Sequence, residues 1–82
     1  MPTKKEIEFL DPIIPGEILL EEFLNPMGIS QNQLARDIDI SPSHSHKIIH
    51  GHAGITAEIA LRLAIYFKTS PEFWINLQRD YE

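Results

Sequence analysis

The histidines are the residues of this chain whose type and spacing first suggest chemistry. All four lie within nine residues, at His44, His46, His50 and His52. His46 and His50 are four positions apart, so on a helix both imidazoles point the same way and could hold Zn²⁺ or Ni²⁺. The nearest acids, Asp37 and Asp39, precede this segment, and the chain has no cysteine. Two histidines alone make an incomplete site, and we predict no physiological metal.

The same histidines have a second possible use, as part of a face that meets nucleic acid. Imidazole gains positive charge below about pH 6.5, and phosphate groups favour that charge. Residues 43–47 are short or basic, carry hydrogen-bond donors and include no acid, so their side chains can reach base edges or phosphates in a major groove. The alternative is that the histidines are exposed polar residues without a role, and the sequence leaves both open.

A catalytic site is not predicted. Asp39, Ser41 and His44 supply the residue types of a hydrolytic relay, but they are close neighbours in sequence at the start of a helix. Serine and aspartate in such places cap helices far more often than they form a relay. The chain also lacks a glycine-rich phosphate loop and paired carboxylates at a plausible cleft. We therefore predict no enzymatic activity and no cofactor.

Two helices joined by a tight turn are expected to position this segment. Ser30, followed three positions later by Gln33, has the spacing of a capping box at a helix start. Ser41, followed by Pro42, repeats the signature of a cap with proline at the first helical position. The second of these helices should end at Gly51, because glycine favours the left-handed backbone of a helix terminus.

The spacing within this pair of helices is that of a helix-turn-helix. Ala35 is the small residue that a steep crossing requires, and Asp39 falls four positions later, where the turn is. Ile40 and Ile48 are placed to bury the underside of the second helix. An ordinary hairpin of two helices is the alternative, since caps and apolar stripes occur in every bundle. We predict that the DNA-contacting residues are Gln31, Asn32, Ser43, His44, His46 and Lys47.

The rest of the chain predicts an all-α fold of five helices in one domain. Residues 1–14 are expected to form an extended arm. A first helix should start at Pro15 and be stopped by Pro26 and Gly28. Thr56 should cap a fourth helix, whose apolar stripe is Ala60, Leu61, Leu63, Ala64 and Phe67.

The fifth helix, which Ser70 and Pro71 should start, is the expected dimer interface. It carries more apolar and aromatic surface than so small a domain can easily bury, and the interface residues we predict are Trp74, Leu77 and Tyr81. The alternative is that Trp74 and Leu77 pack onto the fourth helix, and we expect Phe73 to do so. Removal of this helix should then cost dimerisation while leaving much of the helical structure.

Composition limits the class of protein. Eighty-two residues hold one small core, and without cysteine no disulfide can support it, so dimerisation is the expected source of extra stability. No apolar run approaches the length of a membrane span, and we expect a soluble, cytoplasmic protein with no membrane partner. The net charge is −5, but residues 1–29 hold six acids against two lysines, whereas residues 30–54 are neutral. The charge permits DNA binding without favouring it.

Several strings of this sequence also characterise a known family. They are PGEIL at 15–19, EEFL at 21–24, GISQNQLA at 28–35, GIT at 54–56, ALRLA at 60–64 and TSPEFWINLQ at 69–78. In these strings the chain resembles the HigA family of antitoxins, and the SPEFW string is more specific than the helix-turn-helix spacing. The resemblance implies a lambda-repressor-like helix-turn-helix domain over residues 15–82, following the extended N-terminal arm over residues 1–14.

The resemblance also implies a function. Members of this family are homodimeric repressors that bind a palindromic operator in their own operon and neutralise a HigB-type toxin, an mRNA-cleaving ribonuclease. The family usually has arginine, an apolar residue and asparagine at the positions of His44, Ser45 and His46. Ser45 should face the core, where an unpartnered hydroxyl would cost about 1–3 kcal/mol. The alternative function is a protein-interaction module that binds a basic toxin through its acidic first helix, with little or no DNA binding.

Overall fold

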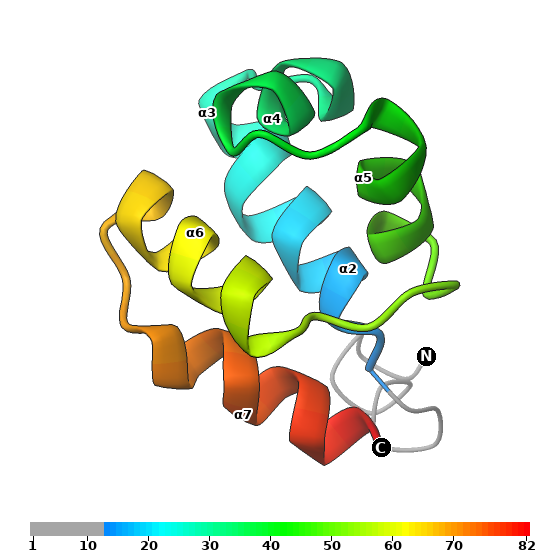
Figure 1. The fold of residues 1–82 in the computed structure, drawn as a ribbon, viewed down its shortest axis with the longest axis vertical. Helices are drawn as coiled ribbons and strands as arrows, with labels where there is room; N and C mark the ends of the chain where they lie inside the picture. Colours follow the sequence, from blue (N-terminus) through cyan, green and yellow to red (C-terminus); the bar gives the residue numbers. More distant parts are fainter. Residues whose placement is uncertain (1–12) are drawn as a thin grey trace, which may run out of the picture.

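The computed structural model describes residues 13–82, which form five helices joined by short turns, with no strand among them (Figure 1). This confirms the predicted all-α class. The expected extended arm falls almost entirely on residues 1–12, which lie outside the described residues. Ile14, just before the first helix, has an extended backbone with φ −76° and ψ 124°. None of the helices in residues 13–82 is long and apolar enough to cross a lipid bilayer.

The first helix is continuous but changes its winding. It begins as α2 (Pro15–Ile18), continues as the π-helical segment η1 (Leu19–Leu24) and ends as α3 (Asn25–Met27). In the π-helical register the Asn25 N–H donates to the Leu20 carbonyl, five residues back.

The prediction that Pro26 stops this helix is wrong. Proline lacks an N–H and crowds the carbonyl four residues before it in a regular helix, and the wider π turn relieves that conflict. The helix ends at Gly28 instead, where φ is 67°. There the Ile29 N–H donates to the Leu24 carbonyl at 2.9 Å. Glycine adopts this left-handed conformation without a steric penalty, so Gly28 supplies the stop that the sequence indicated.

The other four helices, α4 (Gln31–Asp37), α5 (Pro42–Ile49), α6 (Ala57–Phe67) and α7 (Pro71–Tyr81), all start on a side-chain cap. In each case a serine or threonine oxygen accepts from the backbone N–H three residues later. The pairs are Ser30–Gln33 at 3.0 Å, Ser41–His44 at 3.0 Å, Thr56–Ile59 at 3.2 Å and Ser70–Phe73 at 3.2 Å. Each such cap contributes about 1 kcal/mol, and all four were predicted from the sequence.

The first helix lies at the centre of the arrangement, with α5 on one side and α6 and α7 on the other (Figure 1). Its closest approach is to α5. A Cβ on Gly16 would overlap the carbonyl oxygen of Ile48 and the backbone of Ile49, so only glycine allows these two helices to lie this close. The core that the five helices enclose consists of Leu19, Leu24, Leu34, Ile38, Ile48, Ile49, Ile55, Ile59, Ala60, Leu63, Ala64, Phe67 and Trp74.

The fourth helix does not follow the predicted apolar stripe at one position. Leu61 is 51% exposed and points away from the core, whereas Ile59 is buried in its place. The other four residues of the predicted stripe are buried. The prediction for Leu61 is therefore wrong. The helix has a second, solvent-facing apolar surface, and periodicity alone did not distinguish Leu61 on that surface from the residues that face the core.

The last helix is fixed by one side chain. Trp74 is fully buried, its ring packs against Phe23, Phe67 and Phe73, and its indole N–H donates to Thr69 Oγ1 at 2.8 Å. A residue buried inside its own chain cannot form a dimer contact, so the interface prediction is wrong for Trp74, and the alternative of internal packing holds.

Its neighbours divide differently from what the sequence suggested. Phe73, expected to pack internally, is 39% exposed and touches Phe23 and Trp74 by its edge. Leu77 is half-buried against the core, and Tyr81 is 37% exposed. The exposed apolar surface of α7 therefore consists of Phe73, Ile75 and Tyr81 rather than of Trp74 and Leu77.

Candidate nucleic-acid interface

The turn between α4 and α5 has the geometry that its residue types predicted. Ala35 is fully buried where the two helices cross, and the Ile40 N–H donates to the Ala35 carbonyl at 2.9 Å. Asp39 takes the left-handed conformation, with φ 61°. Ile48 is 2% exposed beneath α5, and Ile40 is half-buried beside the turn. The two helices therefore form a helix-turn-helix unit.

Ser45 joins the two helices of this unit. It is 1% exposed, and its hydroxyl donates to the backbone carbonyl of Gln31 at 3.2 Å. The sequence placed a hydroxyl in the core with no evident partner, and this bond supplies one. At this position the resembled family usually has an apolar residue. Here a hydrogen bond instead links Ser45 of α5 to the start of α4.

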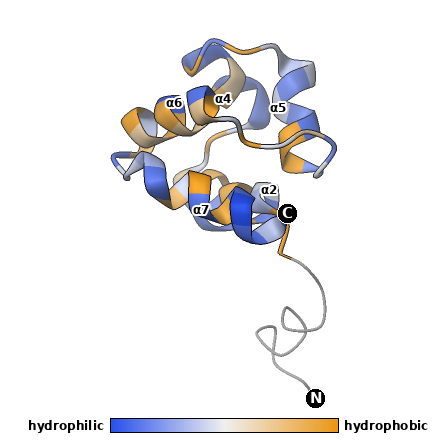
Figure 2. Ribbon diagram, turned by 60° about the horizontal axis from the view of Figure 1, so that its bottom comes forward, coloured by the Kyte–Doolittle hydropathy of each residue, from blue (hydrophilic) through white to orange (hydrophobic). Residues whose placement is uncertain are grey.

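The six predicted contact residues lie on α4 and α5, with Gln31 and Asn32 at the start of α4, Ser43 and His44 at the start of α5, and His46 and Lys47 in its last turn. Asn32, Ser43, His46 and Lys47 are exposed, and Gln31 and His44 are half-buried. Ser43 and Lys47 are four residues apart, so their side chains leave α5 on the same face. The helix changes from hydrophilic at its start to hydrophobic at its end (Figure 2), which separates the outward residues from those that anchor it.

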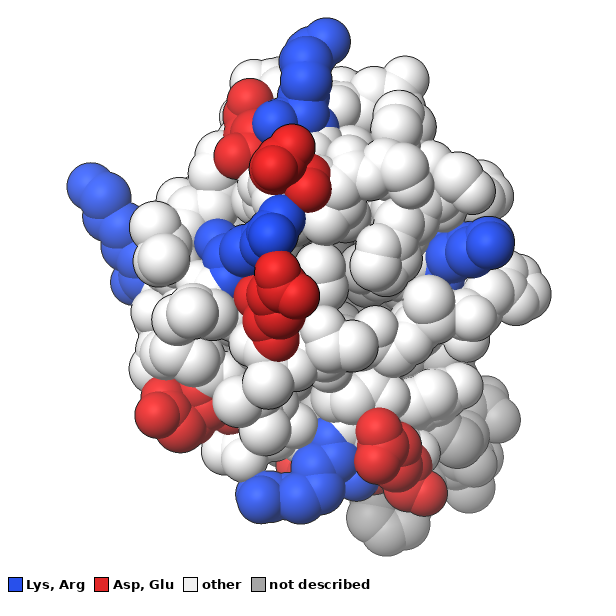
Figure 3. All heavy atoms as spheres, in the orientation of Figure 1, with Lys and Arg blue, Asp and Glu red and all other residues white. Residues whose placement is uncertain are grey.

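The charge on this side of the molecule is sparse and positive. Lys47 is the one residue among Lys, Arg, Asp and Glu that α5 contains. On the face shown in Figure 3, most acidic and basic side chains form a band away from α5. The net charge of −5 is therefore not spread over the candidate interface.

The four histidines do not converge on one point. His46 and His50 are side by side, as their spacing predicted, with ring centroids 4.1 Å apart and ring planes tilted by 45°. His44 lies half-buried at the start of α5, and His52 is exposed in the loop after it. No group of three or more potential metal ligands occurs within residues 13–82. The pair on α5 remains two ligands short of a tetrahedral site.

Two residues of α6 support the helix-turn-helix from outside, and sequence reasoning missed both. Arg62 Nη1 donates to the carbonyls of Ile38 at 2.8 Å and Asp39 at 2.9 Å, directly at the turn. The Tyr66 hydroxyl donates to Asp37 Oδ2 at 2.6 Å. That bond, together with partial burial and the negative charge of Asp37, raises the pKa of Tyr66 above its usual 10.0.

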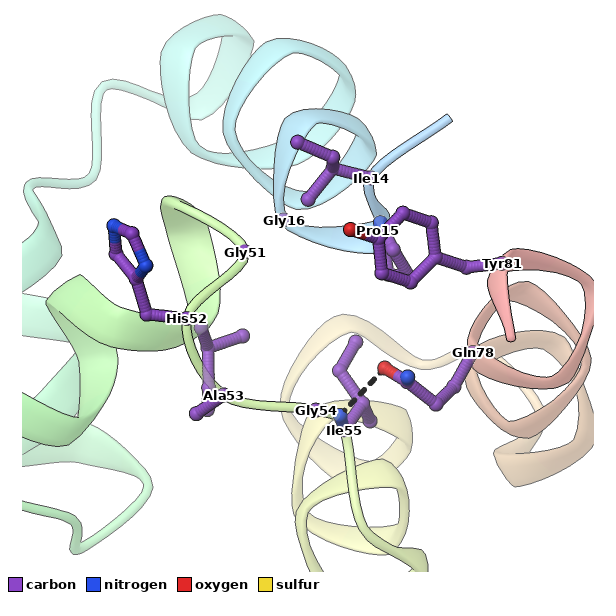
Figure 4. A pocket seen from close by; sticks show the side chains of 11 residues that line it. Ile14, Pro15, Gly16, Gly51, His52, Ala53, Gly54, Ile55, Gln78 and Tyr81 are labelled. Atoms are coloured by element: carbon purple, nitrogen blue, oxygen red, sulfur yellow. Dashed lines mark hydrogen bonds between the residues drawn. The ribbon is translucent and has the colours of Figure 1, made fainter. Parts of the chain in front are cut away.

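A small pocket lies where the start of α2, the loop after α5 and the end of α7 meet (Figure 4). Its volume is about 110 Å³. Gln78 Oε1 accepts from the Ile55 N–H at 2.8 Å across it, and Tyr81 faces Pro15 along its edge. His52 and Tyr81 are the titratable residues in its lining, with no carboxylate among them. The pocket lies between α7 and the helix-turn-helix. Its lining contains no acid–base pair of the kind that catalysis would need.

Comparison with known proteins agrees with this geometry. A family model described as helix-turn-helix matches residues 20–74. Virulence-associated protein I of Dichelobacter nodosus is 47% identical over 70 residues, which are 85% of this chain and 65% of that protein. The Pseudomonas aeruginosa antitoxin HigA, solved with the higBA promoter, has a TM-score of 0.83 and 47% identity over 85% of this chain and 76% of that one.

A third relative extends the agreement to another organism. An addiction module antidote protein of the HigA family from Coxiella burnetii has a TM-score of 0.80 and 50% identity, over 85% of this chain and 76% of that one. The chain spans between 59% and 65% of the length of several curated relatives, so part of each relative has no counterpart here.

Proposed function

The chain belongs to the helix-turn-helix family, within its HigA group, and from this premise we propose that it is an antitoxin that binds operator DNA through α5 and represses its own operon. One observation carries the proposal. The α4–α5 unit presents Ser43 and Lys47 on an outward face without acids, in a fold shared with a relative solved with promoter DNA. The family is a DNA-binding, non-enzymatic class, in agreement with the prediction that the chain is not an enzyme.

The roles of the contact residues follow from their positions. The outer face of α5 enters the major groove, where Ser43 and Lys47, one turn apart, reach base edges or phosphates. Asn32 and Gln31, at the start of α4, lie beside the DNA backbone and fix the register. His44 and His46 add hydrogen-bond donors to this face.

A palindromic operator requires two copies. One recognition helix contacts about half a site, and two of them spaced about 34–36 Å apart across a two-fold axis read both halves. Leu77 and Tyr81 are the residues that we retain for this homodimer contact. Tyr81 lies at the end of α7 beside the loop that follows α5, and Leu77 is one turn before it on the same helix, so a partner there would hold the two α5 helices in a fixed relation.

Neutralisation of a HigB-type, mRNA-cleaving toxin is the second part of the proposal. It is supported by similarity to proteins named as HigA antitoxins. It is also supported by charge, because Glu17, Glu21 and Glu22 are exposed on the first helix and no basic residue occurs between positions 13 and 35. A ribonuclease is expected to be basic, and an acidic surface attracts it.

A gel-shift titration with the DNA upstream of the chain's own operon tests the proposal. We expect a discrete complex that competitor DNA of unrelated sequence does not remove, and that weakens steeply with salt because phosphate contacts release counterions. Binding no tighter than to unrelated DNA would contradict the operator assignment.

That outcome would favour the second candidate, a protein-interaction module that binds a basic toxin with little DNA binding of its own. The observation in its favour is the acidic first helix, which lies apart from α5's outward face. Calorimetric titration with the toxin encoded beside it separates the two. The module binds toxin and fails to shift DNA, whereas the antitoxin does both.

A further inference from the structure

The outer face of α6 carries two large apolar side chains that the core does not use. Leu61 is 51% exposed and Ile65 is 73% exposed, the highest value among the large hydrophobic residues of the described chain. They are four positions apart and therefore adjacent on the helix surface. Neither lies on α5, and Figure 1 shows α5 and α6 on opposite sides of the first helix, so DNA bound to α5 would leave this face uncovered.

Charged residues border the two apolar side chains. Glu58 is at the start of α6, and Lys68 follows its last residue. Arg62 lies between them but is already engaged, because it donates to the carbonyls of the α4–α5 turn and pairs with Glu58 at 2.7 Å. Lys68 is exposed, and its side chain makes no hydrogen bond or ion pair within residues 13–82.

The sequence of this face is complementary to itself when reversed. Positions 61 and 65 are equally far from position 63, and so are positions 58 and 68. A second α6 laid antiparallel about a two-fold axis beside residue 63 would place Leu61 of each copy against Ile65 of the other. The same arrangement would place Glu58 of each copy near Lys68 of the other. This is the layer pattern of an antiparallel helix pair, with apolar layers inside and opposite charges at both ends.

We propose that α6 is a self-association surface, on which the α6 helix of a second copy packs antiparallel about this axis. The groove of about 310 Å³ beside Ile65, bordered by Arg62 and Tyr66, provides room for a side chain of the incoming helix. The interface is separate from the Leu77 and Tyr81 surface of the proposed operator-binding dimer and does not depend on DNA or toxin binding.

The association is expected to be weak in solution. Stable interfaces bury more than about 1,000 Å², and one pair of helices of this length buries less. Copies already close together, such as those on neighbouring operators, would pair through α6 because their effective concentration is high. The α6 surface would then link dimers that are already bound to DNA, and it would not be needed to form those dimers.

Cross-linking tests the register directly, because the chain has no cysteine of its own. Leu61→Cys mixed with Ile65→Cys should form a disulfide-linked pair under mild oxidation, in several-fold higher yield than Leu61→Cys mixed with Met27→Cys. Met27 is a matched control, since it is 56% exposed and lies on α3. Equal yields from the two mixtures would overturn the proposal.

Sedimentation equilibrium from about 10 µM to about 1 mM provides the second measurement. Ile65→Lys should raise the dissociation constant of the association step that adds to the proposed Leu77 and Tyr81 dimer at least about tenfold, while Met27→Lys leaves it unchanged. Circular dichroism confirms that both variants are folded. A chain in which Ile65→Lys weakens no association step would overturn the proposal.

Discussion

Helices α5 and α7 begin in the same way and are held in different ways. Both start at a serine followed by proline, and in both the serine oxygen accepts from the third N–H of the helix, at 3.0 Å in α5 and 3.2 Å in α7. Yet α5 buries Ser45, Ile48 and Ile49, whereas α7 buries Trp74 alone.

The difference shows that a start signal fixes where a helix begins but not what anchors it. Helix α5 lies against the first helix by close backbone approach, made possible by Gly16 and by several modest contacts. Helix α7 depends on one large ring in an aromatic pocket. An anchor spread over several small residues leaves the outer face of α5 free to carry polar groups, while the single anchor of α7 makes that helix sensitive to one position.

The largest effect is expected from Trp74→Ala, which removes the anchor of α7. Truncation of a fully buried aromatic side chain costs about 3–5 kcal/mol, and here it also leaves Thr69 Oγ1 without its donor. Urea unfolding followed by circular dichroism measures the loss, with Ile75→Ala, on the exposed side of α7, as control. By the same reasoning, deletion of residues 70–82 should remove most helical structure, contrary to the expectation from sequence. A loss below about 1 kcal/mol would contradict the single-anchor view.

Gly16→Ala tests the anchor of α5. The added methyl group meets backbone atoms of Ile48 and Ile49, which cannot rotate away as a side chain could, so the helices must separate. We expect a destabilisation of about 1–3 kcal/mol or more. Thermal unfolding against Glu17→Ala, a neighbouring exposed position, provides the comparison. Unchanged stability would mean that α5 does not depend on this close approach.

Lys47→Ala addresses the outer face of α5 and should leave stability unchanged while weakening operator binding by about 1–3 kcal/mol. If Lys47 reads a base, the loss is confined to the operator. If it contacts phosphate, affinity falls for all DNA and the salt slope decreases by about one. Fluorescence anisotropy of labelled DNA distinguishes these cases, with Arg79→Ala on α7 as control. Unchanged affinity for every DNA would remove Lys47 from the interface.

The side chains of His44 and His46 should have a smaller effect on the same face. Each imidazole can donate a hydrogen bond to a phosphate or a base edge, so the variant carrying both His44→Ala and His46→Ala should bind the operator more weakly by about 0.5–1.5 kcal/mol. His52→Ala, in the loop, should not change the affinity. Equal operator affinities of the wild type and the double variant, measured by fluorescence anisotropy, would remove both histidines from the interface.

Tyr66→Phe is expected to have the smallest effect, about 0.5–1 kcal/mol, because it removes one partly exposed hydrogen bond to Asp37. The bond raises the pKa of Tyr66, so its contribution is complete below about pH 10 and is lost as pH rises through the raised value. Urea unfolding at pH 8 and above pH 10 checks this. Tyr81→Phe, at a hydroxyl that makes no such bond within residues 13–82, serves as control, and an equal loss in both variants would contradict the assignment.

The sequence predicted those parts of the molecule that depend on local chemistry. Caps, the turn at Asp39 and the buried position of Ser45 follow from residue types at fixed short spacings. Arg62 and Tyr66 could not be found in this way, because their partners on α4 and its turn lie between 23 and 29 positions away.

The wrong predictions for Pro26, Phe73 and Trp74 also arise from features that short-range residue patterns do not contain. Pro26 is tolerated because the preceding turns widen, which no property of proline itself indicates. Phe73 and Trp74 are adjacent on α7, so a modest error in the rotation of the helix exchanges the buried residue for the exposed one. The residues that we propose contact DNA all lie on α4 and α5, but which of them would touch a base depends on the operator and not on the fold.

Trp74 is the only tryptophan in the sequence, and its position has a spectroscopic consequence. Its indole is fully buried beside the rings of Phe23, Phe67 and Phe73, none of which lies on α5. Intrinsic emission excited at the indole band should therefore be blue-shifted in the native protein and move to longer wavelength when α7 detaches. Occupation of the α5 face should leave it unchanged. The intrinsic fluorescence of Trp74 thus distinguishes unfolding of the chain from release of a ligand at α5, without any added label.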